Sequence, residues 1–153
     1  MSGDGAVGTA EASPDPVRIA RLRALALAMP GAEESVRFGH LVWKARAGGS
    51  GFVWIRPFTK ADVRREGPPP PGTITAFRVA DELAKQELRA ADDAVFTIQH
   101  FDGFPAVLAV LETLDDARLA ELVVEAWIAT APPPDVRSWL DAHPDLDRDA
   151  GST

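Results

Sequence analysis

The fold of this chain is built around residues 36–58, which read VRFGHLVWKARAGGSGFVWIRPF. Both halves of this stretch are rich in β-branched and aromatic residues, which suit a pleated, half-buried strand. Between them stands Gly48-Gly49-Ser50-Gly51, and glycine adopts positive φ angles without a Cβ clash. The stretch therefore predicts two strands joined as a β-hairpin with a bulge or a longer turn, which the other segments cover or extend.

Side chains alternate between the two faces of a strand, and this predicts how the second strand is oriented. Val53 and Ile55 share one face, while Phe52, Trp54 and Arg56 share the other. Because the first set is wholly apolar, we expect Val53 and Ile55 under the helices. Trp54 and Arg56 are then expected on an open face of the sheet.

Length and composition limit the class of protein. A chain of 153 residues fits one domain that buries a core without metal or disulfide staples. Cysteine is absent, which excludes disulfides, thiolate zinc sites, iron–sulfur clusters and thiol nucleophiles. The N-terminus shows no signal-peptide pattern, and no stretch approaches the roughly twenty apolar residues of a membrane span. We therefore expect a soluble, cytoplasmic protein without a membrane partner.

Charge is unevenly distributed along the chain. The formal net charge of −7 disfavours a nucleic-acid partner at long range, because phosphates are repelled. Residues 112–153 hold ten acids and three arginines, whereas residues 37–65 hold seven cations and one acid, Asp62. The sequence thus predicts a basic hairpin region and an acidic C-terminal part. The seven cations are Arg37, Lys44, Arg46, Arg56, Lys60, Arg64 and Arg65.

The N-terminal half offers clear boundary signals. Residues 1–15 are small and polar without periodicity, which predicts a disordered tail. Asp15 or Ser13 is expected to cap a first helix that has Pro16 near its first turn and ends at Pro30-Gly31. Residues 59–72 contain four consecutive prolines and are predicted to form a loop.

The C-terminal half continues the alternation of strands and helices. Residues 73–79, 95–99 and 106–111 are predicted as the third, fourth and fifth strands. Asp81 is expected to cap a second helix that reaches about Ala91, with Leu83, Ala84 and Leu88 inward. The last long helix begins at Asp115 or Thr113. Its apolar positions fall at helical spacing: Leu119, Leu122, Val123, Ala126 and Trp127.

The order helix, three strands, helix, two strands, helix resembles the MmcQ/YjbR family. Three motifs carry the resemblance: MPGAEE at residues 29–34, GHLVW at residues 39–43, and a D-x-x-x-L-x-x-L pattern at residues 115–122. The chain departs from the family pattern by Val107 in place of a frequent Trp and Trp127 in place of a Tyr. It also has Arg78 where members usually have Lys.

The resemblance implies a two-layer α+β fold with helices on one face of a curved antiparallel five-stranded sheet. Such a fold is similar to type III secretion chaperones and frataxin-like domains. The domain is then expected at residues 16–131. Residues 132–153 are expected to form a Pro-rich segment, a short helix and an acidic disordered tail. The family's customary description as DNA-binding rests on fold analogy.

No catalytic, metal or cofactor site is predicted, and we expect the protein not to be an enzyme. His40, His100 and His143 match no zinc or catalytic spacing. His100 stands two residues before Asp102, which could orient its imidazole, but a polar turn explains this pair better. The glycine-rich turn lacks the Lys-Ser/Thr and the following helix of a phosphate-binding loop.

Cations alternate with aromatic residues between residues 37 and 60. Single-strand binders combine cations for phosphate with flat rings for stacking, although such rings can equally be core residues beside solvated cations. The leading hypothesis is therefore a non-enzymatic module that binds DNA through the basic hairpin. The alternative is a protein-interaction module that docks a peptide or a second copy on the open sheet face. The candidate nucleic-acid-binding residues are Arg37, Lys44, Arg46, Trp54, Arg56, Lys60, Arg64 and Arg65.

Overall fold

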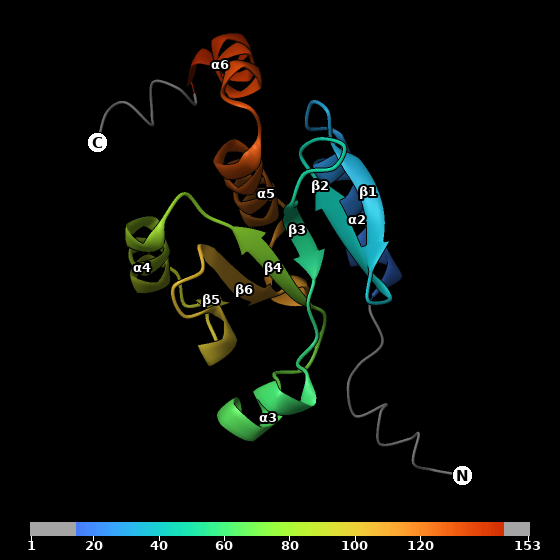
Figure 1. Ribbon diagram of the computed structural model, residues 1–153, viewed down its shortest axis with the longest axis vertical. Helices are drawn as coiled ribbons and strands as arrows, with labels where there is room; N and C mark the ends of the chain where they lie inside the picture. The colour runs from blue at the N-terminus through green and yellow to red at the C-terminus, as the bar shows by residue number, and fades with distance from the viewer. Residues whose placement is uncertain (1–14, 146–153) are drawn as a thin grey trace.

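The computed structural model describes residues 15–145 as an α+β fold with one antiparallel sheet (Figure 1). The tail predicted at residues 1–15 lies outside the described residues except for Asp15, and so does most of the acidic tail predicted at the end of residues 132–153. The sheet order is β1-β2-β3-β4-β6-β5, and every neighbouring pair is antiparallel. The strands are β1 (Glu33–Arg37), β2 (His40–Lys44), β3 (Gly51–Ile55), β4 (Ile74–Arg78), β5 (Val95–Phe96) and β6 (Ala106–Val110).

The helices accompany this sheet on several sides. Two of them, α2 and α5, pack on one face of the sheet, whereas α4 lies beside β5 and α3 projects below β3 (Figure 1). The helices are α2 (Pro16–Leu27), α3 (Lys60–Glu66), α4 (Glu82–Ala91), α5 (Asp116–Thr130) and α6 (Pro133–Ala142). The 3₁₀ turns are η1 (Gln99–Phe101) and η2 (Leu111–Thr113). Within residues 15–145, no helix has the length and apolar character needed to cross a bilayer.

The sheet has six strands, and the prediction of five was wrong because the expected first strand is two strands. Phe38 (φ 52°) and Gly39 (φ 80°) form a tight turn between β1 and β2, with Arg37 paired to His40. Two successive positive φ angles are what a two-residue hairpin turn needs. Phenylalanine seldom adopts such an angle, so a turn at this position is hard to predict from local residue preferences.

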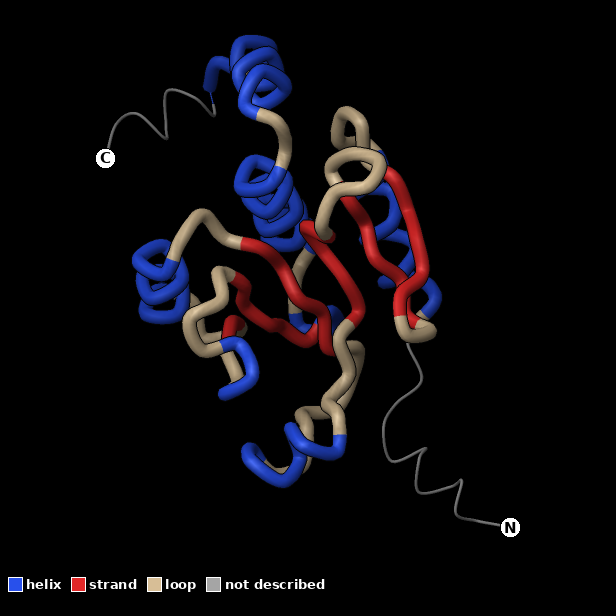
Figure 2. Tube along the Cα trace, in the orientation of Figure 1, coloured by secondary structure: helices blue, strands red, loops and turns tan. Residues whose placement is uncertain are grey.

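The segment predicted as a loop at residues 59–72 contains a helix, α3 (Figure 2). A capping box starts it: the Thr59 side chain accepts a hydrogen bond from the Asp62 amide, and the Asp62 carboxylate accepts one from the Thr59 amide. Only residues 67–73 remain as the proline-rich connection. The Thr-x-x-Asp spacing is a helix-start signal, and the run of prolines after it obscured that signal.

The caps predicted for three other helices are confirmed. The carboxylates of Asp15, Asp81 and Asp115 accept hydrogen bonds from backbone amides in the first turns of α2, α4 and α5. All five predicted apolar positions of α5 are buried. In α4, Leu88 packs against the main core as predicted, whereas Leu83 is 67% exposed and the buried residue is Lys85. The strand predicted at residues 95–99 ends at Phe96, since η1 takes over from Gln99.

The main core fills the space between the sheet and the helices α2 and α5. Val53 and Ile55 belong to it, as predicted, and Trp54 lies on the opposite face. Phe52 was expected beside Trp54 but is fully buried in the main core. The reason is a bulge, because the pairing shifts by one residue between Trp43 and Lys44 and so reverses the alternation of β3.

The face of the sheet that carries Trp54 is not bare. A second, smaller apolar cluster lies there, beneath η1 and the turn that follows it. This cover reduces the open face expected from the sequence to a recess beside Trp54. The buried members of the cluster are Ile74, Ala76, Ile98, Phe101, Ala106, Leu108 and Val110.

Candidate binding cleft

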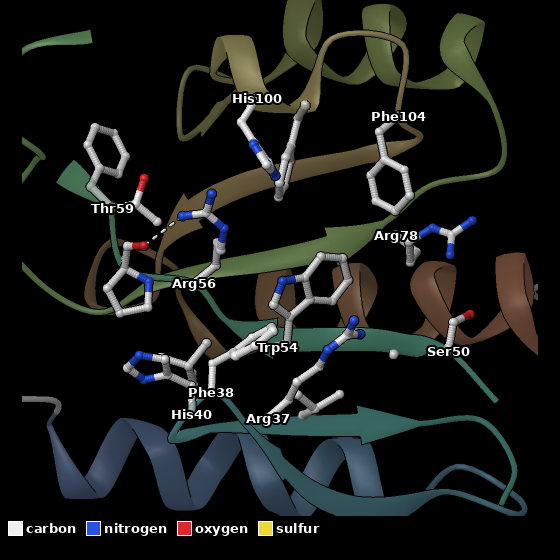
Figure 3. A pocket seen from close by; sticks show the side chains of 16 residues that line it. Arg37, Phe38, His40, Ser50, Trp54, Arg56, Thr59, Arg78, His100 and Phe104 are labelled. Carbon is white, nitrogen blue, oxygen red and sulfur yellow. Dashed lines mark hydrogen bonds between the residues drawn. The ribbon is translucent and has the colours of Figure 1, made fainter. Parts of the chain in front are cut away.

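A cleft of about 790 Å³ lies on the Trp54 face of the sheet (Figure 3). Its walls come from the β1–β2 hairpin, from β3 and the segment after it, from β4, and from residues 100–104. None of the described residues that line it is an Asp or Glu. The cationic or titratable lining residues are Arg37, His40, Arg56, Arg78 and His100. The aromatic ones are Phe38, Trp54, Phe58, Phe101 and Phe104.

Trp54 forms the floor of the cleft. It is paired with Val42 on β2 and with Ala76 on β4, so small or branched side chains flank it across the sheet. Phe101 and Phe104 stand over one side of the indole, with ring centroids 6.2 Å and 6.4 Å away in tilted and edge-on arrangements. These are favourable aromatic geometries, and they leave the indole half-exposed towards the cleft.

Arg56 is held in place by a buried carboxylate. Its Nη1 donates to Asp62 Oδ2 at 2.8 Å and to the Pro57 carbonyl at 2.6 Å. Burial opposes ionisation of Asp62, but hydrogen bonds from the Thr59 amide and from Arg56 outweigh it and hold the pKa of this carboxyl below its ordinary value. Asp62 is 1% exposed, so the ion pair both offsets the charge of Arg56 and docks the first turn of α3.

Arg78 carries a charge that no carboxylate offsets among residues 15–145. Its Nε donates to the Pro105 carbonyl at 3.1 Å, and its guanidinium carbon lies 5.0 Å from the Phe104 ring centroid. Burial lowers the pKa of Arg78, yet an arginine stays charged at neutral pH. Arg37 is exposed, and its guanidinium lies 5.5 Å from the Phe38 ring centroid. The cleft therefore has an uncompensated positive charge from these two arginines.

A buried lysine fixes the aromatic wall. Lys85, on α4, is 1% exposed, and its Nζ donates to the carbonyls of Phe101 at 2.6 Å and Phe104 at 2.9 Å. The nearest carboxylate oxygen belongs to Glu82 and is 3.9 Å away. A charged donor in an apolar setting needs such partners, so the ammonium ties the backbone of this turn to α4.

Phe38 stands at the rim of the cleft on the tip of the β1–β2 turn. Its side chain is 89% exposed and its φ angle is positive. A bulky residue with a positive φ is a conformational outlier, and such outliers cluster at sites of function. The turn thus holds an exposed ring beside Arg37 at the cleft mouth.

The two histidines that the sequence separates by sixty positions, His40 and His100, line the same cleft. His100 contacts the Phe101 ring at a centroid distance of 5.7 Å, and it forms no hydrogen bond with Asp102 among the described residues. The sequence favoured a polar turn at His100 and Asp102, and in the structure His100 lies in η1, which Asp102 follows directly. Residues 15–145 contain no group of three or more His, Cys, Asp or Glu arranged for a metal ion.

The structure divides the residues predicted to bind nucleic acid. Arg37, Trp54 and Arg56 line the cleft. Five others do not line it: Lys44 ends β2, Arg46 lies in the following turn, and three are on α3, namely Lys60, Arg64 and Arg65.

Sequence reasoning missed the residues supplied by other elements. Arg78 lies two residues after Ala76 on β4, so both side chains are on the same face of the sheet, and Ala76 pairs with Trp54. The alternation of side chains along β4 could therefore have predicted that Arg78 lies on the face of Trp54. Phe101 and Phe104 line the cleft from a turn that Lys85 holds to α4, and no local sequence pattern predicts this contact.

The motif at residues 29–34 has a structural role outside the cleft. Glu34 accepts hydrogen bonds from Arg23 at 2.7 Å and from the Trp43 indole at 3.0 Å, and the Arg23 bond contributes most to lowering its pKa. Trp127, found in place of the family's Tyr, donates its indole N–H to the Pro30 carbonyl at 3.0 Å. A hydrogen bond therefore joins α5 to the connection that follows α2.

The chain is similar to one protein family and to individual mycobacterial proteins. Residues 27–129 match the YjbR family model, and this span contains every residue that lines the cleft. Uncharacterized protein Mb2600 of Mycobacterium bovis and uncharacterized protein Rv2570 of Mycobacterium tuberculosis are each 41% identical to the chain over 100 residues. The similarity covers 62% of this chain and 78% of each relative. No solved structure matches the chain.

Proposed function

The chain belongs to the YjbR family, and on that premise we propose that it is a non-enzymatic binding module whose cleft holds single-stranded DNA. The observation that carries the proposal is the cleft lining. A half-exposed indole is surrounded by three arginines and further aromatic rings, and none of the described lining residues is a carboxylate. Proteins that bind single strands combine stacking rings with a positive groove in this way.

Each part of the cleft has a role in this proposal. A base stacks on Trp54, and such stacking contributes about 1–3 kcal/mol per base. Arg37 and Arg78 attract phosphates, because no carboxylate among residues 15–145 offsets their charges. Arg56 keeps N–H groups beyond the one bonded to Asp62, since a guanidinium has five.

The cleft, rather than the whole basic hairpin, is the proposed contact. Lys44, Arg46 and the α3 cations lie outside the lining, so the proposal assigns them no phosphate contact. The net charge of −7 repels strands from the rest of the surface, so binding depends on the local charge of the cleft.

The experiment is an anisotropy titration of a labelled twelve-residue oligothymidylate at low and moderate salt. Arg78→Gln should weaken binding and make the salt slope shallower by about 0.7, the value expected for one phosphate contact on a single strand. Arg64→Gln, a matched change of an exposed arginine on α3, should leave both quantities unchanged. Absence of binding, or binding indifferent to salt, contradicts the proposal.

The non-enzymatic part of the proposal rests on the same lining. A nucleophile needs an adjacent base, and among the described residues neither lining hydroxyl, of Ser50 or of Thr59, has a hydrogen bond to His40 or His100. The Thr59 hydroxyl accepts the capping hydrogen bond of α3. Incubation of the oligonucleotide with the protein and Mg²⁺, followed by a denaturing gel, should return the strand unchanged. A shortened or modified strand would show that binding is followed by a chemical step.

A second candidate function, docking of a peptide or a second copy, is favoured by the edge of the sheet. β1 is the terminal strand, and Val36 on it is 65% exposed. An exposed strand edge is a template for pairing with another chain. Light scattering should then give a dimer mass that Val36→Lys returns to the monomer. A monomer at all concentrations removes the second-copy version of this candidate.

A further inference from the structure

From the arrangement around Trp54, we infer that the cleft is a site for one base and its two flanking phosphates, so a trinucleotide segment fills it. The inference rests on the proposed function, since it concerns how much of a strand the same cleft holds. It distinguishes a single-base site from a groove that follows a long stretch of backbone.

The register of the sheet places the cations on opposite sides of the stacking ring. Arg56 follows Trp54 by two residues, one position beyond the end of β3, which is about 7 Å along the same face. Arg78 follows Ala76 by two residues on the antiparallel neighbour β4, and Ala76 is the residue paired with Trp54. Arg56 and Arg78 therefore leave the indole in opposite directions along the strands, as Figure 3 shows. One base on Trp54 has one phosphate towards each of them.

Segments held by hydrogen bonds flank both arginines. Past Arg56, the chain turns through Pro57 and Thr59 into α3, which the buried Asp62 ties back to Arg56. Past Arg78, the guanidinium rests against Phe104, in the turn that Lys85 holds to α4. A volume of about 790 Å³ is that of a small-molecule site rather than an extended channel.

The cations outside the cleft add no phosphate contacts within it. Lys60 and Arg64 are exposed on α3 and do not line the cleft. Lys44 and Arg46, at the other end of the hairpin region, do not line it either. A strand longer than the cleft consequently gains no further phosphate partner within it. Affinity should then stop rising once the base and both its phosphates are present.

The test is a length series of thymidine oligonucleotides, from two to twelve residues, competed against a labelled twelve-residue strand. Affinity is divided by the number of registers in which each strand can bind. We expect this corrected affinity to rise up to the trinucleotide and then stay constant. The salt slope should be about −1.4 for both the trinucleotide and the twelve-residue strand, corresponding to two phosphates.

Paired variants sharpen the result. Arg78→Gln should weaken the trinucleotide and the twelve-residue strand by the same factor, while the double change Lys60→Gln and Arg64→Gln should weaken neither. Circular dichroism melts check that each variant folds.

The outcomes distinguish failure of the single-base inference from failure of the proposed function. A corrected affinity or salt slope that keeps growing beyond the trinucleotide overturns the single-base inference, and so does a loss confined to the long strand in the α3 variant. Either result leaves the proposed function standing. Failure of the twelve-residue strand to bind at all overturns the proposed function itself.

Discussion

At the scale of single residues, Lys85 shows how a charge inside the protein can shape a surface. Lys85→Met removes the donor of two hydrogen bonds to the carbonyls of Phe101 and Phe104. Leaving such acceptors unpaired in a buried place costs about 1–3 kcal/mol. We expect a loss of that size in urea unfolding, together with a change in indole fluorescence as the wall over Trp54 loosens.

The matched control for this change is Lys60→Met, which alters an exposed lysine at the start of α3. It should shift neither the unfolding midpoint nor the fluorescence. If Lys85→Met behaves like this control, the ammonium does not hold the turn.

Trp54 and Trp43 differ in burial, so their truncations should differ in kind. Trp43 is fully buried in the main core, and Trp43→Ala should cost about 3–5 kcal/mol of stability. Trp54 is half-exposed, and Trp54→Ala should cost less stability while removing about 1–3 kcal/mol of single-strand affinity. Thermal melts beside anisotropy titrations measure both effects. Equal destabilisation by the two changes would place the Trp54 indole in the core and remove the stacking floor.

At the scale of elements, α3 is docked by a carboxylate whose ionisation matters. The folded protein lowers the pKa of Asp62, so the unfolded chain binds the proton more readily. The resulting stabilisation is present above the unfolded pKa of about 3.9 and is lost as pH falls through the folded value. The stability difference between the wild type and Asp62→Asn should therefore shrink on acidification below about pH 4.

Unfolding of both proteins in urea between neutral pH and pH 3 checks this dependence. Other carboxylates with lowered pKa values, such as Glu34 and Asp92, contribute to the acid response of both proteins and cancel in the comparison. A difference that stays constant across this range would mean that the ionisation of Asp62 does not stabilise the docked helix.

The β1–β2 hairpin contains the other element-scale prediction. Phe38 holds a positive φ that asparagine tolerates far better, and its exposed ring contributes little burial. Phe38→Asn should stabilise the protein by about 1 kcal/mol, the lower end of the cost of such a conformation. The same change should weaken strand binding if the ring at the rim contacts the ligand. Phe38→Ala keeps the unfavourable φ and should show the loss in binding without the gain in stability.

These elements also show what the sequence could and could not predict. Helix caps at Asp15, Asp81 and Asp115, and the apolar stripe of α5, are local patterns, and the structure confirms them. The β1–β2 turn has an atypical residue at its first position, and α3 is short, so local statistics favoured a longer strand and a loop. The bulge that turns Phe52 inward depends on pairing with β2, which no single segment encodes.

At the scale of the whole molecule, charge is separated in space as it is in sequence. The acidic helix α6 lies at the opposite end of the molecule from α3 (Figure 1). Asp135→Asn with Asp141→Asn reduces the repulsion of a strand without touching the cleft. Stopped-flow measurements at low salt should show faster association and unchanged dissociation, because remote charges act mainly on encounter. A change confined to the dissociation rate would contradict a purely long-range effect.

Part of the candidate site could be predicted from strand alternation, and the rest depends on contacts between segments distant in sequence. Alternation along β3 placed Trp54 and Arg56 together, and the same reasoning applied to β4 reaches Arg78. The residues of the wall, Phe101 and Phe104, come from a turn whose position depends on Lys85. Half of the cleft is therefore a property of the sheet and the other half a property of packing between distant segments.

The sheet separates two apolar clusters, and this separation bears on how the protein can diverge. Val53 and Trp54 are neighbours in sequence, yet one belongs to the main core and the other to the recess on the far side. Mutations that reshape the recess therefore act on side chains that the helices α2 and α5 do not contact. A lineage with this architecture can exchange one ligand for another by drift at alternate positions of the same strands, while selection for folding continues on the positions in between.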